Sequence, residues 1–394
     1  MGLENRKEAK TWFDFFDVLQ GKSVKVWSED VFKVFNLIKR YQPERIFGKI
    51  IKGIPVITAV HSTKRGKALG GTRILVYQDM ANAFRDALKL SSAMTYKAIW
   101  SRLPLGGGKT VIFADPKEIG KGFLKEYAHF LNEINEKSEP KIQFLTGEDV
   151  GFSEGFADVV AKYTRYIAGK SVKAGGLGDP SPKTAKGIFL AAKAIVEKGG
   201  FFSGTLKYKI AAVMGAGKVA LPLIEMLLNE GVTVYFSEPD EKKAKIAENL
   251  GAQRVELDRI FRVSCHIFMP CAIGGTINKD TIPLLSPMCQ IIIGAANNIL
   301  DTPEDGIELH RKRIYFAPDY VVNRWGLEWV YQESRGITDL AVAEKNLTDI
   351  ETDILKIIKL SQERNIAISE VADMISKKIL EDQAETIEGA FEQF

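Results

Sequence analysis

Residues 210–220, IAAVMGAGKVA, join a short apolar run directly to a glycine-rich turn and the start of a helical pattern. The run is typical of a buried parallel strand, and residues 219–229 continue as an apolar helix. Further strands are expected at residues 232–236, 291–293 and 314–316, and a further helix at 241–250. Alternation of strand and helix builds a parallel sheet with helices on both faces, so the sequence predicts a doubly wound α/β domain.

The turn itself reads Gly215-Ala216-Gly217-Lys218-Val219-Ala220, the pattern G-x-G-x-x-A. The first glycine allows the tight turn, and the second lets the backbone approach a pyrophosphate at the helix N-terminus. Glu238, at the end of the next strand, can accept hydrogen bonds from ribose hydroxyls and would repel a 2′-phosphate. The pattern therefore predicts a Rossmann-type domain that binds NAD in preference to NADP. A tight turn followed by a solvated Glu238 is the alternative interpretation.

The bulk composition is that of a globular protein with two domains. A chain of 394 residues, 45% hydrophobic and 26% charged, exceeds one ordinary core. The net charge of +4 comes without a run of like charges, so no nucleic-acid partner is expected. Residues 1–7 are charged and do not resemble a secretory signal, and no apolar run is long enough to cross a membrane. The 3 cysteines lie in apolar segments and predict reduced, buried thiols in a cytoplasmic protein.

The rest of the chain supplies a second α/β region and a helical tail. The expected elements are a strand at 54–60, a helix at 82–94, a glycine-rich loop at 105–108, a strand at 111–113 and a helix at 184–197. Glycine and proline crowd residues 175–182 and predict a hinge. The tail carries isoleucine stripes at helical spacing, interrupted near residues 365–367. We therefore predict domains at 1–182 and 183–346, with the helices of 347–394 joined to the first.

Three charged side chains lie in surroundings that suggest chemistry. Lys97 and Lys109 stand in uncharged or glycine-rich sequence, and Asp149 lies in a loop before the hinge. Two lysines that meet in a cleft lower each other's pKa, and one of them can then act as a base. Solvated surface lysines and a turn-forming aspartate are the alternatives. A phosphate-binding P-loop ending at Lys109 is excluded, because its first glycine would fall at Leu103. No metal site is predicted.

Eight blocks of sequence together resemble the leucine/phenylalanine/valine branch of the glutamate dehydrogenase superfamily. They are ALGGTR (68–73), MTYK (94–97), LGGGKT (105–110), EDVG (148–151), PSPKTA (180–185), PCAIGG (270–275), ANN (296–298) and APDYVVN (317–323). The resemblance implies an NAD-dependent dehydrogenase that converts an L-amino acid into its 2-oxo acid and ammonia. It also implies a homo-oligomer built through the first domain, which would be the substrate domain.

The resemblance also assigns roles to the charged residues. Lys97 would hold the substrate carboxylate with the backbone of Gly70 and Gly71. Lys109 would be the base of low pKa that activates water for attack on the imino acid. Asp149 would carry the proton to and from the substrate nitrogen, while the two domains close and exclude water.

The cofactor side follows from the same resemblance. Thr184 would contact the nicotinamide carboxamide, and Asn297 would bridge cofactor and substrate. The other expected cofactor contacts are Gly215, Ala216, Gly217, Lys218, Val219, Glu238, Cys271, Ala272, Ala295 and Asn323.

The sequence departs from the family pattern at three places. Residues 98–102 are bulky where the family has small residues, Arg324-Trp325 replaces Ala-Gly after Asn323, and Phe152-Ser153 follows the aspartate block where the family commonly has Thr-Thr. The first two departures concern the shape of the pocket and the geometry on the cofactor side.

The identity of the amino acid rests on the residues around the predicted pocket. Gly147 stands where leucine-type members tend to carry alanine, and Leu327 is similar to the phenylalanine type. With Val330, these residues predict a pocket for phenylalanine or tryptophan. Leucine or another branched amino acid, a non-proteinogenic amino acid, and a catalytically silent NAD-binding regulatory protein remain alternatives.

Overall fold

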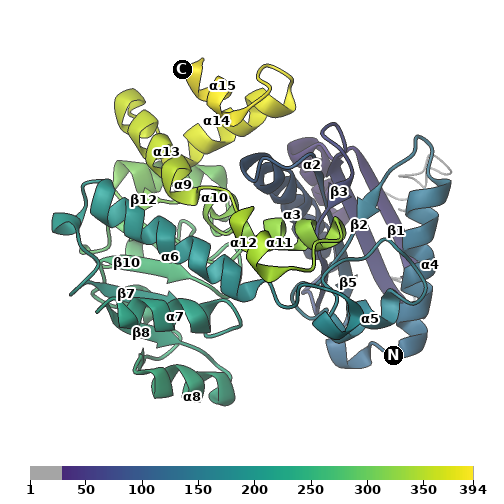
Figure 1. Cartoon of the computed structure of the whole chain (residues 1–394), viewed down its shortest axis with the longest axis horizontal. Helices are drawn as coiled ribbons and strands as arrows, with labels where there is room; N and C mark the ends of the chain where they lie inside the picture. The colour runs from purple at the N-terminus through teal and green to yellow at the C-terminus, as the bar shows by residue number, and fades with distance from the viewer. Residues whose placement is uncertain (1–28, 394) are drawn as a thin grey trace. The chain divides into compact units, whose positions relative to one another are not determined.

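The computed structural model describes residues 29–393, which divide into two compact units (Figure 1). In the described part, the first unit comprises residues 29–98, 103–179 and 330–342, and the second comprises 99–102, 180–329 and 343–393. The prediction for residues 1–7 lies outside the described residues. None of the described helices has both the length and the apolar character needed to span a membrane.

The first unit is built on a mixed sheet with the strand order β1-β2-β5-β3-β6, and β4 pairs with β5. The strands are β1 (Arg45–Ile51), β2 (Ile54–Ser62), β3 (Ala68–Leu69), β4 (Thr72–Leu75), β5 (Gly106–Phe113) and β6 (Phe144–Leu145). The pairs β1/β2 and β2/β5 are antiparallel, whereas β3 and β4 run parallel to β5. The long central strand β5 is therefore flanked on both sides and almost entirely buried.

The glycine run at 105–108 is strand rather than the loop expected from its composition. Gly106, Gly107 and Gly108 open β5 because neighbouring groups leave no room for a side chain. A Cβ on Gly106 would lie 1.7 Å from the carbonyl oxygen of Ser62. A Cβ on Gly107 would lie 2.2 Å from the backbone nitrogen of Thr95, and one on Gly108 would lie 2.6 Å from the ring of Phe144. Close packing, and not a turn, requires these glycines.

Helices cover both faces of this sheet. They are α2 (Glu29–Tyr41), α3 (Met80–Trp100), α4 (Lys121–Lys137) and α5 (Glu154–Val160). On one face Phe84 and Leu88 of α3 pack on Ile57 and Val111 of the sheet, and on the other α4 and α5 cover a separate core. Helix α3 extends six residues beyond the predicted 82–94, so its last turn carries Lys97.

The second unit contains a parallel sheet with the strand order β12-β11-β10-β7-β8-β9. Its strands are β7 (Ile210–Met214), β8 (Thr233–Ser237), β9 (Gln253–Arg254), β10 (Ile267–Pro270), β11 (Ile291–Ile292) and β12 (Tyr315–Phe316). The chain moves outward from β7 in one direction and then, from β10, in the other. This order confirms the predicted doubly wound fold, and its switch point lies between β7 and β10, where such folds bind ligands beyond the carboxyl ends of the strands.

The helices of this unit are α6 (Ser181–Lys198), α7 (Ala220–Asn229), α8 (Glu241–Leu250), α9 (Pro303–Arg311), α10 (Asp319–Val322), α11 (Trp325–Ser334), α12 (Leu340–Lys345), α13 (Ile350–Arg364), α14 (Ile368–Leu380) and α15 (Ile387–Glu392). Both α11 and α12 cross the boundary between the units. The tail belongs to the second unit rather than the first, because Ile354 and Ile357 of α13 enter the same core as Ile188 of α6. Asn365 ends α13 in the left-handed conformation, at the predicted interruption.

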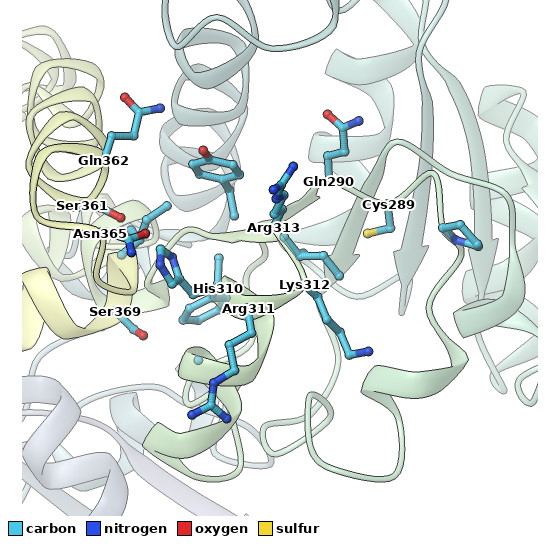
Figure 2. A pocket seen from close by; sticks show the side chains of 16 residues that line it. Cys289, Gln290, His310, Arg311, Lys312, Arg313, Ser361, Gln362, Asn365 and Ser369 are labelled. Carbon is cyan, nitrogen blue, oxygen red and sulfur yellow. The ribbon is translucent and has the colours of Figure 1, made fainter.

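A cavity of about 780 Å³ opens in the second unit between residues 310–316 and residues 361–369 of α13, α14 and the turn that joins them (Figure 2). Among its lining residues, 312–314 immediately precede β12 and 289–290 immediately precede β11, so the cavity lies at the amino ends of these parallel strands. The Gly215 turn follows β7 at the carboxyl ends. The cavity is therefore separate from the switch-point crevice in which a dinucleotide is expected.

Candidate active site

Lys109 and Asp149 form a close ion pair in the first unit. The Nζ atom of Lys109 lies 2.9 Å from Oδ2 of Asp149, and the lysine side chain is 3% exposed. Lys109 projects from the middle of β5, and Asp149 lies in the tight turn after β6, where its backbone exchanges hydrogen bonds with Phe152. Two segments far apart in the sequence thus bring an amine and a carboxylate together in a nearly dry environment.

The two glycines of the 70–71 pair allow this approach. A Cβ on Gly70 would lie 1.7 Å from the carbonyl oxygen of Gly108. On Gly71 it would lie 2.8 Å from Cβ of Asp149 and 3.1 Å from Nζ of Lys109. Any side chain at either position would therefore displace the strand or the ion pair.

A guanidinium group lies on the other side of Asp149. Nε of Arg73, on β4, donates to the same Oδ2 atom at 2.9 Å. Nη1 of Arg73 donates to both carboxylate oxygens of Asp86 on α3, at 3.0 and 3.3 Å. The hydroxyl of Tyr77 donates to Asp86 at 2.6 Å. Sequence reasoning gave no role to Arg73 or Asp86. The available signal was a charged residue two positions after the glycine pair, in a short strand with two buried residues.

The ion pair shifts both titrations. Burial lowers the pKa of Lys109 below its usual range, Asp149 opposes this shift, and the positive charge of Arg73 lowers the pKa further. The main cationic contribution thus comes from Arg73 rather than from Lys97, the expected source. Burial alone would raise the pKa of Asp149, but Arg73 and Lys109 reverse that effect and hold it well below the usual value. Lys109 therefore loses its proton more readily than a surface lysine, and Asp149 stays ionised.

Lys97 and Gly147 lie on segments that pack against Gly107 of β5 and against the 70–71 pair. Lys97 is 7% exposed on the last turn of α3. The turn before it packs on Gly107, since a Cβ there would lie 2.5 Å from the carbonyl oxygen of Ser91. Gly147 follows β6 two residues before Asp149, and its carbonyl accepts a hydrogen bond from the backbone N–H of Thr72. The predicted substrate residues Gly70, Gly71, Lys97 and Gly147 thus lie on three segments of the first unit.

The second unit contains the predicted dinucleotide turn. Gly215 has φ +103, a conformation that favours glycine, and a Cβ there would lie 3.0 Å from Cβ of Ala272. Glu238, at the end of β8, accepts hydrogen bonds from the backbone N–H of Ala216 at 2.8 Å and of Asp240 at 3.0 Å. The structure therefore brings Gly215, Ala216, Glu238 and Ala272 together at the carboxyl ends of β7, β8 and β10.

Three of the other predicted cofactor contacts meet around Asn323. Its Nδ2 atom donates to the carbonyl oxygen of Ala295 at 3.2 Å and to Oδ1 of Asn297 at 3.3 Å. Thr184 lies beside the same turn, because a Cβ on Gly326 would be 2.4 Å from its Oγ1 atom. Of the remaining residues, Lys218 and Val219 lie between the turn and α7, and Cys271 follows β10 directly. Burial raises the pKa of Cys271 to about 12, so its thiol stays protonated.

These surroundings fit a dinucleotide. No atom lies within 4 Å of a Cβ built on Gly217, so the backbone there is open to an approaching phosphate. Among the described residues, the buried atoms Oδ1 of Asn323 and Nδ2 of Asn298 have no hydrogen-bond partner. Buried polar atoms normally have partners, so unsatisfied groups beside the switch point are those that a bound cofactor would satisfy.

Comparison with known proteins identifies the family of the chain. Residues 47–166 match the family described as Glu/Leu/Phe/Val dehydrogenase, dimerisation domain, and residues 237–386 match Glutamate/Leucine/Phenylalanine/Valine dehydrogenase. Leucine dehydrogenase of Geobacillus stearothermophilus is 36% identical over 353 residues, which is 89% of this chain and 94% of that protein.

The chain belongs to the Glu/Leu/Phe/Val dehydrogenase family.

L-tryptophan dehydrogenase of Nostoc punctiforme is similarly related to this Glu/Leu/Phe/Val dehydrogenase, at 38% identity over 332 residues, or 84% of this chain and 89% of that protein. The crystal structure of L-tryptophan dehydrogenase from that organism covers 89% of this chain and 99% of its own, with a TM-score of 0.68 and 33% identity. Family membership makes the chain an oxidoreductase of the amino-acid dehydrogenase class, whose members depend on NAD or NADP.

Two departures from the family pattern in this dehydrogenase serve the packing of its tail. Nε1 of Trp100 donates to Oγ of Ser376 on α14 at 3.0 Å, and Arg102 binds Asp353 on α13. Arg324 is fully buried, with Nη2 2.7 Å from Oδ2 of Asp353. Nε1 of Trp325 donates to the carbonyl oxygen of Thr348 at 2.8 Å. These bulky side chains hold the C-terminal helices within the second unit.

The residues predicted for the substrate side chain lie on different segments. Leu327 and Val330 are three residues apart on α11, and thus on neighbouring positions of one helix face. Leu327 belongs to the second unit, whereas Val330 and Gly147 belong to the first.

Proposed function

We propose that the chain catalyses the reversible, NAD-dependent oxidative deamination of an L-amino acid with a large apolar or aromatic side chain. The products are the 2-oxo acid and ammonia. The observation that carries the proposal is the ion pair of Lys109 and Asp149, 2.9 Å apart with the lysine 3% exposed. A dry amine of lowered pKa beside an ionised carboxylate supplies the two proton carriers that this reaction needs.

The residues of the first unit act on the amino acid. Lys97, with the backbone around Gly70 and Gly71, binds the α-carboxylate, because a buried ammonium offers a positive charge and three donors. Asp149 removes a proton from the α-amino group, which leaves a neutral nitrogen. Hydride departure from Cα then gives an iminium carbon that water attacks.

Lys109 acts as the general base for that water. Its neutral amine takes a proton from the attacking water, which gives a carbinolamine. Asp149 then returns to the nitrogen the proton that it removed earlier, and ammonia leaves as the carbinolamine hydroxyl gives its proton to solvent water. Burial lowers the pKa of Lys109 and favours the neutral form of the amine, which is the form that can accept this proton. The proposal requires the amino acid held at these residues to meet a nicotinamide held by the second unit.

NAD would be held by the second unit. The Gly215 turn and the open backbone at Gly217 would bind the pyrophosphate. Thr184 and Asn323 would contact the nicotinamide end, with Asn297 between cofactor and substrate. When bound, NAD accepts the hydride from Cα. Glu238 supports NAD over NADP, because its carboxylate would repel a 2′-phosphate at the end of β8.

The preference for a large side chain rests on Gly147, Leu327 and Val330. Glycine at 147 leaves out a methyl group that would reduce the proposed pocket. Relatives named for leucine and for tryptophan are almost equally similar, at 36% and 38% identity, so identity does not separate the two classes. A leucine or branched-chain dehydrogenase is therefore the second candidate.

The assembly follows the domain roles. We propose that residues 1–182 form the substrate and oligomerisation domain and that 183–346 form the dinucleotide domain. The match of residues 47–166 to a dimerisation domain supports a homo-oligomer built through the first unit.

The experiment that tests the function is a substrate panel. The purified chain is assayed at alkaline pH with each proteinogenic L-amino acid and with NAD or NADP, and reduction is followed at 340 nm. Turnover of tryptophan or phenylalanine with NAD is expected, and turnover of leucine alone favours the second candidate. An absence of turnover throughout would refute the proposal and favour a catalytically silent NAD-binding protein.

A matched pair of lysine variants links that activity to the site. Lys109→Ala should abolish turnover and leave the affinity for NAD largely intact, because the substitution lies in the first unit. Lys121→Ala, at an exposed position at the start of α4, is the control and should behave as the wild type. Near-normal activity of Lys109→Ala would refute the mechanism.

A further inference from the structure

Five side chains of the first unit form a chain of alternating charge that begins at the catalytic pair. In order they are Lys109 of β5, Asp149 of the turn after β6, Arg73 of β4, Asp86 of α3 and the hydroxyl of Tyr77. The exposed fractions of the charged side chains are 3% for Lys109, 15% for Asp149, 14% for Arg73 and 23% for Asp86. The partial burial of every member strengthens the coupling between neighbouring charges.

Arg73 holds two carboxylates with two different edges of its guanidinium. Nε binds Asp149, and Nη1 binds Asp86. The strand fixes this direction, because the preceding residue, Thr72, points the other way and its hydroxyl meets those of Tyr127 and Thr146. Lysine has a single point charge and cannot bridge the two carboxylates in this manner.

Lys109 and Arg73 hold Asp149 through only one of its two carboxylate oxygens. Lys109 and Arg73 both contact Oδ2, each at 2.9 Å. Within the described residues, Oδ1 accepts no hydrogen bond from a side chain. A carboxylate held through one oxygen presents the other in a fixed direction, and this is the oxygen that a substrate nitrogen would meet.

We propose that Arg73 is the positioning residue of this site: it fixes Oδ2 of Asp149, leaves Oδ1 for the substrate nitrogen, and, balanced by Asp86, sets the charge that Lys109 experiences. The role of Oδ1 rests on the proposed function. The effect of the two charges on Lys109 does not, and it can be measured without turnover.

The two partners affect Lys109 in opposite directions. The charged groups with the largest effect on it are Asp149, Arg73 and Asp86. Burial contributes most to the lowered pKa of Lys109, Arg73 lowers it further, and Asp86 raises it. Nε of Arg73 and Nζ of Lys109 are no more than about 6 Å apart, since each lies 2.9 Å from the same oxygen. At that separation one charge moves a pKa by about one unit.

The test compares Arg73→Gln with Asp86→Asn. Removal of the positive charge should move the acid limb of the kcat/KM profile about one pH unit upward, because Lys109 then holds its proton more tightly. Removal of the negative charge should move it downward by about half a unit. Arg73→Gln should also lower kcat by about 100-fold with little change in the KM for NAD, and Arg73→Lys should restore the acid limb more than it restores kcat.

A second readout is independent of catalysis. Lysines labelled with ¹³C at Cε are titrated by NMR, and the signal of Lys109 is identified by its loss in Lys109→Met. Opposite shifts of this titration in the two variants support the proposal. Arg45→Gln, whose guanidinium contacts the carbonyl oxygen of Glu139 near the surface, is the control and should leave both measurements unchanged.

The outcomes separate this inference from the proposed function. If the wild type turns over an amino acid but neither variant shifts the acid limb or the Lys109 titration, the role of Arg73 is refuted and the function stands. Shifts in the same direction in both variants would also overturn it, because a general loss of structure does not depend on the sign of the charge removed. If Lys109 titrates as expected but no amino acid is oxidised, the function fails and the charge coupling stands.

Discussion

Gly147→Ala is the substitution that most directly tests the proposed substrate. Glycine at this position has no positive φ, so alanine introduces no backbone strain. The new Cβ would lie 3.2 Å from the carbonyl oxygen of Ala168 and 4.0 Å from that of Gly70. The first distance requires a movement of a few tenths of an ångström, and the second is ordinary contact. The methyl group is thus accommodated, and it occupies space beside the glycines proposed to bind the substrate.

The expected magnitude follows from the size of that group. A methylene or methyl added to an apolar pocket changes discrimination between substrates by about 1–2 kcal/mol. This corresponds to about a 5- to 30-fold change in the ratio of kcat/KM for tryptophan or phenylalanine to that for leucine. The ratio should fall in the variant, because the larger side chain loses room and the smaller one does not.

The assay measures kcat/KM for the three amino acids with the wild type, with Gly147→Ala and with Gly120→Ala. Gly120 precedes α4 and has open space around a built Cβ, so its alanine variant controls for the loss of a glycine in the same unit. Thermal unfolding is recorded for each protein. A ratio unchanged within twofold in a folded, active Gly147→Ala would remove the basis for the proposed specificity. An equal loss for all three substrates with a lower Tm would mean that the contact with Ala168 acts on stability instead.

Three further predictions concern the cofactor, the tail and pH. Glu238→Gln should raise the ratio of kcat/KM for NADP to that for NAD at least tenfold, because it removes the charge that would repel a 2′-phosphate. Steady-state kinetics with both cofactors measures this ratio, and a constant ratio would contradict the prediction. Arg324→Met should lower the free energy of unfolding by about 3 kcal/mol, because the buried carboxylates of Glu328 and Asp353, which are 2% and 1% exposed, then lose their cationic partner. Urea unfolding measures this loss, with the exposed Arg311→Met as the control. An unchanged unfolding midpoint in Arg324→Met would refute the prediction. Burial lowers the pKa of His61 to about 4, so the folded state favours the neutral ring and its protonation on acidification destabilises the fold. Stability from this group should be complete above about pH 6.5 and fall by about 3 kcal/mol as the pH drops to 4, whereas His61→Gln should show a smaller decline in urea titrations at the two pH values.

The second unit was largely predictable because its sequence pattern is local. The strand at 210–214, the turn at Gly215 and the helix α8 follow from apolar runs, glycine and spacing, and each involves neighbours along the chain. The fold of the first unit was harder to predict from the sequence. The glycines of 106–108 indicated a loop by composition, but a backbone oxygen, a helix turn and a phenylalanine ring from distant segments make them a strand.

Some residues of the candidate site could likewise be predicted from the sequence, and others could not. Lys109 and Asp149 could be selected as candidates from their sequence surroundings and from the family resemblance. The contribution of Arg73 could not be predicted, because Arg73 reaches Asp149 across 76 residues and Asp86 across 13. A residue that acts through charge at a distance leaves no spacing signal in the sequence, and only the fold assigns the positive neighbour of Lys109 to Arg73 rather than Lys97.

The bulky residues that depart from the family pattern near the predicted site share one structural role. Arg102 and Arg324 both bind Asp353, and Glu388 on α15 binds Arg102, so one carboxylate of α13 joins the end of α3 to the turn after Asn323. The small residues usual in the family offer no such bonds. Because Asn323 begins the segment that Arg324 fixes, the tail also stabilises the position of a proposed cofactor contact. The departures are therefore adaptations of the second unit to its own C-terminal helices, and they leave Lys109, Asp149 and Arg73 in the first unit unaltered.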